Sequence, residues 1–132
     1  MIVRCFVNDI SKIKSGSLVE RLKQYINLDG PDNDLEIGNE YPVHAIENRG
    51  GHWWFYIHNV EVNSYPFPYP SEFFHIVRSG IPSHWTIKMD LINGQSVLAR
   101  ITFQEWNDDD LFYERLVEGD PEISKIYLSS RA

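Results

Sequence analysis

Histidines are the side chains of this sequence that could most readily bind a metal ion, and there are five of them. His44 and Glu47 are separated by a spacing that puts their side chains on opposite faces of a strand. His52 and His58 share one face of an expected strand but lie about 20 Å apart at ~3.3 Å per residue. The sequence contains no HExxH motif, no Cys–His set and no complete calcium-binding loop. We therefore predict no metal and no other cofactor.

Nucleophilic and acid–base catalysis have equally little support. The single cysteine, Cys5, lies in an expected apolar strand without an adjacent histidine, and no GxSxG motif occurs. A buried, inert thiol is the simpler interpretation. The carboxylates at 108–110 are typical of the first turn of a helix, where the helix dipole favours negative charge. We therefore expect that the protein is not an enzyme, and an active site assembled from histidines and carboxylates is the least favoured hypothesis.

The elements that would position any site fit within one domain. A chain of 132 residues, with 42% apolar and 23% charged residues, can bury a core without a disulfide or a metal. We divide it into an N-terminal strand and helix (1–35), a β-barrel core (36–104) and C-terminal helices (105–132). Its apolar runs are shorter than the ~20 residues that span a bilayer, and no signal peptide is recognisable. We expect a cytoplasmic protein.

Aromatic-rich and alternating segments predict a series of antiparallel strands. Met1–Val7 favours a first strand, and the capping-box pattern Ser17–Glu20 predicts a helix after it. Prolines 66, 68 and 70 exclude a central strand at 64–70 and favour an extended border segment. Asn93-Gly94 is typical of a hairpin turn, because both residues tolerate a positive φ. Further strands are expected at 41–46, 52–60, 73–78, 84–91 and 96–103. In the hairpin around Asn93-Gly94, Trp85, Ile87 and Met89 are expected on one face of the strand, and Thr86 and Lys88 on the opposite face.

Two short helices are predicted after the last strand. Asn107 and Asp108 can cap the first of them, and Asp120-Pro121 is typical of the start of the second. The first helix is expected to bury the stripe Leu111, Phe112 and Leu116, with Val117 as its further member. The predicted fold is α+β: a strongly curved antiparallel sheet of about five strands, an SH3-like barrel, with one N-terminal helix and two short C-terminal helices.

Charge is the feature with most functional content. Nineteen acids against twelve bases give a net charge of −7, which disfavours nucleic acids and anionic membranes as partners. Eight acids and one base lie between positions 105 and 122, more than helix capping requires. Such a surface favours a basic protein partner, and the residues expected to bind it are Asp108, Asp109, Asp110, Glu114 and Glu118. A competing acidic site is formed by Asp29, Asp32, Asp34 and Glu36.

The middle of the chain resembles a known family. The resemblance covers roughly residues 36–116 and is carried by core and turn positions, namely 37–46, 53–57, Tyr65-Pro66, Pro70, 73–77, Trp85, 103–106 and 112–116. These positions are similar to those of small bacterial SH3-like proteins, among them immunity proteins of contact-dependent inhibition and related polymorphic toxin systems. The resemblance implies a cytoplasmic antidote without catalytic residues that binds a toxin domain, commonly a basic nuclease, and blocks its active site.

Two hypotheses for binding therefore stand side by side. In the favoured one, a non-enzymatic immunity protein masks a cognate toxin electrostatically, with buried ring anchors such as Trp54, Tyr56 or Tyr65 inside the acidic surround. In the alternative, an SH3-like module binds a peptide or ligand through the proline- and aromatic-rich segment 64–70.

Overall fold

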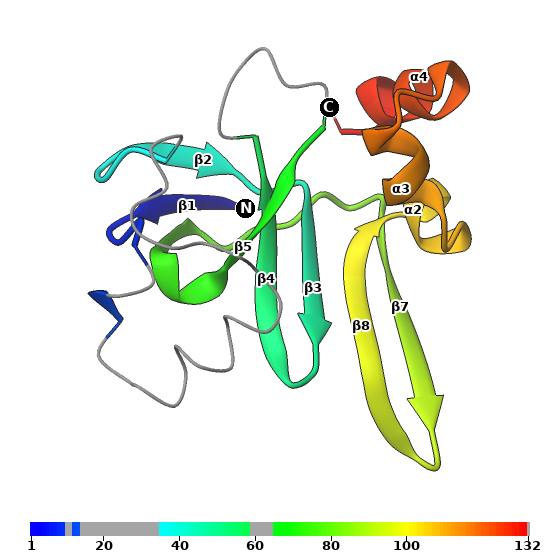
Figure 1. The fold of residues 1–132 in the computed structure, drawn as a ribbon, viewed down its shortest axis with the longest axis horizontal. Helices are drawn as coiled ribbons and strands as arrows, with labels where there is room; N and C mark the ends of the chain where they lie inside the picture. Colours follow the sequence, from blue (N-terminus) through cyan, green and yellow to red (C-terminus); the bar gives the residue numbers. More distant parts are fainter. Residues whose placement is uncertain (10–11, 14–34, 59–64, 132) are drawn as a thin grey trace.

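The computed structural model describes residues 1–9, 12–13, 35–58 and 65–131, and the strands in these residues form two antiparallel sheets (Figure 1). The smaller sheet has the order β2-β1-β6 and consists of β1 (Ile2–Cys5), β2 (Glu40–Pro42) and β6 (Phe74–Arg78). The larger sheet has the order β5-β4-β3-β8-β7 and consists of β3 (Ala45–Arg49), β4 (His52–Ile57), β5 (Phe67–Pro70), β7 (Trp85–Ile92) and β8 (Gln95–Phe103). A short 3₁₀ helix, η2 (Ser71–Phe73), precedes β6, and three helices follow β8: α2 (Gln104–Asp108), α3 (Phe112–Val117) and α4 (Pro121–Ser130).

The predicted α+β barrel of about five strands was wrong, because the described strands form two sheets and no closed barrel. The segment expected as one strand at 41–46 changes sheets at its middle. Val43 N–H donates to the Met1 carbonyl at 3.0 Å, whereas the next amide, of His44, donates to the Tyr56 carbonyl at 2.9 Å. One half of the segment therefore joins β1 and the other half joins β4, which separates the sheets.

The helices also differ from the prediction. Three of them, rather than two, follow β8. The predicted helix beginning at Ser17 lies outside the described residues, and the described part before β2 contains no α-helix. No helix in the described residues is long and apolar enough to cross a membrane.

Buried side chains form two clusters. The first cluster joins the sheets and contains Val3 and Cys5 of β1 with Trp54, Phe55 and Ile57 of β4. The second lies under the helices and consists of Ala45, Tyr56, Phe103, Trp106, Phe112, Leu116, Ile123 and Tyr127. Strand β4 contributes to both clusters, which explains why both of its faces carry large apolar side chains.

Strand β5 lies at one edge of the larger sheet, where its prolines cost no ladder hydrogen bond on the outer side. The predicted hairpin is confirmed at the other edge, where β7 pairs with β8 through Asn93 (φ 51°) and Gly94 (φ 77°). Figure 1 shows this hairpin reaching beyond the β3–β4 hairpin.

The chain breaks between α2 and α3, where a single helix was predicted. Asn107 does not cap α3, because it lies buried inside α2. Asp109 instead accepts a hydrogen bond from the Leu111 amide at 2.9 Å in the turn between the helices. The start of α4 follows the prediction: Asp120 accepts from the amides of Glu122 and Ile123, with Pro121 in the first turn.

Candidate functional site

The exposed face of α3 combines apolar and acidic side chains. Phe112 and Leu116 turn inward and are fully buried. At 100° per residue, the opposite side of the helix is occupied by Leu111, Glu114, Val117 and Glu118. All of these side chains are exposed, including Leu111 at 55% and Val117 at 41%. We call these four residues the α3 face.

Leu111 and Val117 were expected in the buried stripe of this helix, and both expectations were wrong, because the two side chains are exposed. The reason is the break before α3: Leu111 occupies the N-cap position with φ −100° and ψ 5°, and the helix turns its first buried side chain, Phe112, inward after it. The sequence offered no signal for the break, because the residues around it, at 107–110, are all good capping residues.

Intramolecular ion pairs engage part of the predicted acidic surface. Arg115 binds Asp109 at 3.2 Å and Asp120 at 2.9 Å. Lys88 of β7 binds Asp110, and this hydrogen bond holds the pKa of the Asp110 carboxyl below its usual value. Asp110 therefore lies before α3 and turns towards the sheet instead of extending the α3 face.

Five other carboxylates near the helices have no ion pair within the described part of the chain. They are all exposed, and they are Glu105, Asp108, Glu114, Glu118 and Glu122. Asp108 accepts a hydrogen bond from the side-chain amide of Gln104 at 2.6 Å, and this neutral donor leaves its charge uncompensated. The α3 face thus lies among negative charges that the described part of the fold does not neutralise.

The predicted aromatic anchors lie away from solvent. Trp54 and Tyr56 are only 1% and 3% exposed, because the two core clusters enclose β4. Tyr65 is half-buried, and its ring packs against that of Phe67 with centroids 5.3 Å apart. In this conformation Trp54 and Tyr56 serve the core and present no surface to a partner.

The competing acidic site is described at one position only. Asp29, Asp32 and Asp34 lie outside the described residues. Glu36 is exposed, and its carboxylate accepts a hydrogen bond from the side-chain amide of Asn39 at 2.9 Å.

A buried polar network lies between α2 and the larger sheet. Its centre is Glu47, whose carboxylate accepts from Arg49 at 2.6 Å and lies 3.5 Å from Nη1 of Arg100. Tyr56 donates to the same carboxylate at 3.4 Å, and burial raises the pKa of its hydroxyl. Each charge in this network faces an opposite charge, so the network links elements of the fold.

Histidines form a second polar group near the end of α4. His58 bonds the Tyr127 hydroxyl at 2.6 Å and Arg131 at 3.0 Å, and its ring centroid lies 5.0 Å from that of His44. Burial, reinforced by His58 and Arg131, lowers the pKa of His44 to about 3. Two of the five histidines therefore do meet in space, and no group of three metal-binding side chains occurs in the described residues.

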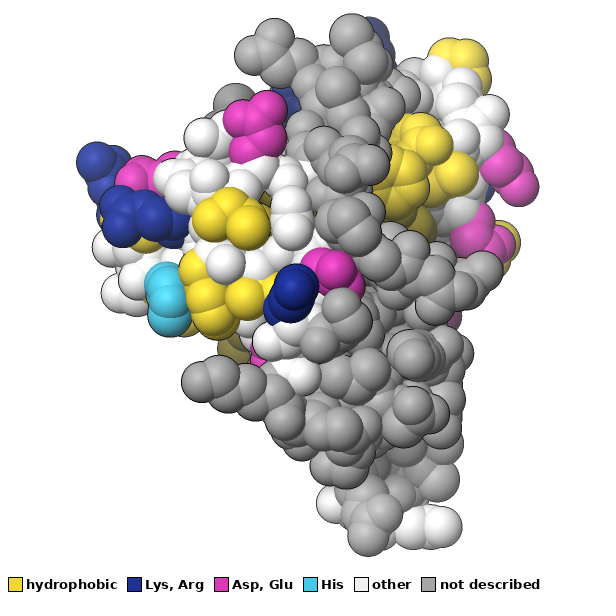
Figure 2. Space-filling model, turned by 60° about the vertical axis from the view of Figure 1, so that its left-hand side comes forward, with side chains coloured by type: hydrophobic (Ala, Val, Ile, Leu, Met, Phe, Trp, Pro, Cys, Tyr) yellow, Lys and Arg dark blue, Asp and Glu magenta, His cyan; other side chains and the backbone are white. Residues whose placement is uncertain are grey.

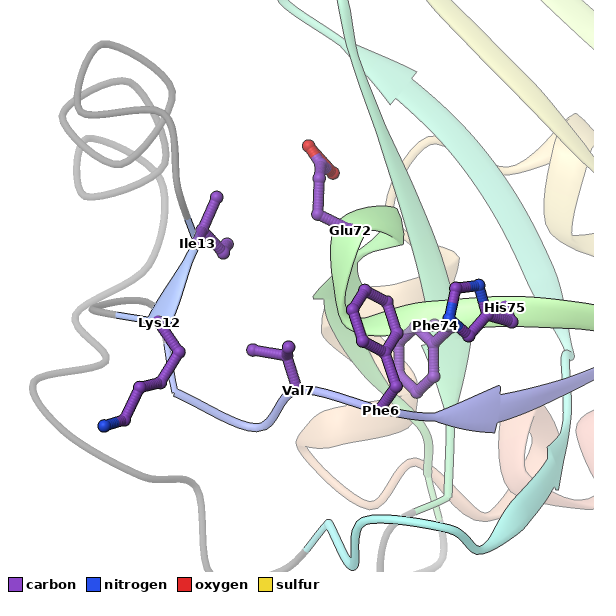
Figure 3. A pocket seen from close by; sticks show the side chains of 7 residues that line it. All are labelled: Phe6, Val7, Lys12, Ile13, Glu72, Phe74 and His75. Atoms are coloured by element: carbon purple, nitrogen blue, oxygen red, sulfur yellow. The ribbon is translucent and has the colours of Figure 1, made fainter.

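A cavity of about 470 Å³ opens beside β1 and β6. Figure 3 shows the rings of Phe6, Phe74 and His75 on one side of it and Lys12 and Ile13 on the other. Its described lining is mostly apolar, and the one carboxylate, Glu72, is already bonded to His52 at 2.8 Å and to Ser71 at 3.0 Å. Figure 2 shows small groups of hydrophobic side chains lying between charged ones on this side of the molecule. The ring of His75 stacks on that of Phe6, with centroids 4.1 Å apart.

No protein-family model, no curated protein and no solved structure matches this chain. No residue role is therefore carried over from a relative.

Proposed function

We propose that this chain is a non-enzymatic immunity protein, which binds a basic toxin domain and covers its active site. The observation that carries the proposal is the α3 face, where two exposed apolar side chains, Leu111 and Val117, accompany Glu114 and Glu118, whose carboxylates have no ion pair within the described residues. Protein interfaces have this composition when a few apolar anchors carry affinity and surrounding charges select the partner.

The like charges of Glu114 and Glu118 favour a cationic partner. Glu114 and Glu118 are separated by one helical turn, a spacing at which two carboxylates repel each other. A positively charged surface relieves that repulsion when it binds. Complementary charge also accelerates association, which suits an inhibitor that must reach its toxin before the toxin reaches its substrate.

A nuclease is the expected class of partner. Enzymes that act on nucleic acid bind its phosphate backbone with lysine and arginine, and their clefts are therefore basic. The net charge of −7 and the acidic surround of the α3 face are complementary to such a cleft.

The proline- and aromatic-rich segment has a second use within the fold, so we do not propose it as the binding surface. Tyr69 is buried, and Tyr113 of α3 donates a hydrogen bond to the Pro66 carbonyl at 2.8 Å. The burial of Tyr69 and the hydrogen bond to Pro66 hold this segment against the rest of the molecule.

Capture from the native host followed by mass spectrometry would identify a partner, and the captured domain must be basic and lose its activity when the chain is added. Association rates are then compared for the wild type, the double variant Glu114→Lys/Glu118→Lys and the single variants Glu118→Lys and Glu36→Lys. We expect the double variant to slow association most strongly at low salt, because each exposed charge pair contributes roughly 0.2–1 kcal/mol and is screened by ions.

The variant Glu36→Lys is the matched control, since it makes the same charge change on an exposed carboxylate far from α3 in the sequence. If only Glu36→Lys slows association, the interface lies at the competing acidic site instead of the α3 face. Unchanged rates and salt dependence in all variants, or an acidic partner, would overturn the proposal.

A further inference from the structure

Strand β7 ends the larger sheet with an open edge. The strand order β5-β4-β3-β8-β7 leaves its outer side without a paired strand among the described residues. Strand β8 pairs with β3 only from Leu98 to Ile101, so the outer part of the hairpin projects beyond the sheet. An open strand of this length presents a row of backbone donors and acceptors that can pair with another strand.

One face of this edge strand is an exposed apolar row. Ile87, Met89 and Leu91 alternate along β7 and are 65%, 55% and 60% exposed, and the register of the pairing with β8 shifts between Asp90 and Leu91. Natural edge strands are usually protected by charged side chains or proline. Here Lys88 lies on the opposite face and binds Asp110 of the same chain, so it does not protect the apolar row.

The order of side chains along β7 is self-complementary. If two copies pair antiparallel with Met89 opposite itself, Ile87 lies opposite Leu91 of the second copy, and Lys88 lies opposite Asp90. Apolar residues then meet apolar residues on one face, and opposite charges meet on the other. Asp90 is exposed and has no ion pair within the described part of the chain, so it is available for this contact.

Neighbouring registers lack this match. Centring the pair on Lys88 puts two lysines opposite each other, and centring it on Asp90 puts two aspartates opposite each other. If one strand is shifted by a single residue, so that Lys88 lies opposite Met89, charged side chains lie opposite apolar ones, because successive side chains point to opposite faces. Charge and apolar pattern together select the register centred on Met89.

We propose that two copies of this chain associate through antiparallel pairing of their β7 strands, with Met89 on the two-fold axis. The pairing continues the larger sheet from one copy into the other and covers the apolar row of both. Lys88 keeps its bond to Asp110 and also reaches Asp90 of the second copy, since an ammonium group has three donors. The interface is isologous, as a two-fold dimer requires. It is independent of the function proposed above.

Sedimentation or light scattering of the full chain over a range of concentrations tests the association. We expect the wild type to form dimers and Met89→Lys to raise the dissociation constant about tenfold or more, because two lysines would then meet on the axis. The matched control is Leu128→Lys on α4, since Leu128 is exposed to the same extent, 55%, and should leave the constant unchanged. Circular dichroism confirms that both variants are folded.

A cysteine placed on the axis tests the register. Met89→Cys should form a disulfide-linked dimer rapidly on mild oxidation, because the two sulfurs face each other across the strand pair. Ile87→Cys should link much more slowly, since its opposite residue is Leu91, and the native Cys5 is buried. A wild type that stays monomeric, a Met89→Lys variant that still dimerises, or equal linking rates at 87 and 89 would overturn the proposal.

Discussion

Asn107 of α2 accepts a hydrogen bond from Nε of Arg100 on β8 at 3.0 Å, and both side chains are buried. The Asn107 amide also donates to Oγ1 of Thr86 at 2.9 Å and to the Thr102 carbonyl at 3.3 Å. One side chain therefore ties the first C-terminal helix to both strands of the β7–β8 hairpin.

Replacing Asn107 should weaken the fold measurably. Asn107→Ala leaves Nε of Arg100 and the oxygens of Thr86 and Thr102 without this partner in a buried site, and we expect the free energy of unfolding to fall by roughly 1–3 kcal/mol. Urea denaturation followed by circular dichroism measures the change. The neighbouring variant Asp108→Ala is the control, because Asp108 is exposed and should change stability little. Equal stability of the two variants would show that the buried network contributes nothing.

Truncating Glu47 should lower the free energy of unfolding more than truncating Asn107. Glu47→Ala removes the carboxylate that faces Arg49 and Arg100, leaving a buried guanidinium uncompensated, and should cost about 3–5 kcal/mol. Glu47→Gln keeps the shape and one acceptor, so we expect a smaller loss. Urea denaturation of the two variants gives the order, and a larger loss for Gln than for Ala would contradict the role assigned to the carboxylate.

His44 should make stability depend on pH. Burial, with His58 and Arg131, lowers its pKa to about 3 in the folded chain, below the ordinary value of 6.5. Between these pH values the unfolded chain binds a proton that the folded chain does not, so the free energy of unfolding falls as the pH is lowered from 6.5 towards 3.

Comparing the wild type with a variant that lacks His44 separates the contribution of His44 to the pH dependence of stability from the contribution of the carboxylates. In His44→Gln the free energy of unfolding should fall less between pH 6.5 and pH 3 than in the wild type, by on the order of 1–3 kcal/mol. The control is His75→Gln, at an exposed position on β6. Stability is measured by urea denaturation at several pH values, and identical slopes for the wild type and His44→Gln would refute the prediction.

Two glycines should respond differently to alanine. Gly94 has a φ of +77° in the hairpin turn, where an alanine is strained by about 1 kcal/mol. Gly80 has no positive φ and no atom within 4 Å of an added Cβ, so Gly80→Ala should be neutral or slightly stabilising. Thermal or urea unfolding distinguishes them, and a destabilisation of Gly80→Ala that equals that of Gly94→Ala would argue against the turn geometry.

The sequence determined the features that depend on neighbouring residues. The β7–β8 hairpin follows from Asn93-Gly94, because a tight turn needs positive φ at both positions. The start of α4 follows from Asp120-Pro121, and the edge position of β5 follows from prolines that lack an N–H group. Each of these signals acts within a few residues, so no tertiary contact was needed to recognise it.

Tertiary structure decided how the strands are shared between sheets and which side chains reach solvent. The switch at Val43 and His44 depends on the Met1 and Tyr56 carbonyls, which are distant in sequence. Asn107 could serve as a cap or as a buried partner, and Arg100 on the neighbouring strand made it the latter. Local propensity is similar for such alternatives, and the free energy that separates them comes from burial and hydrogen bonding between segments that only the folded chain brings together.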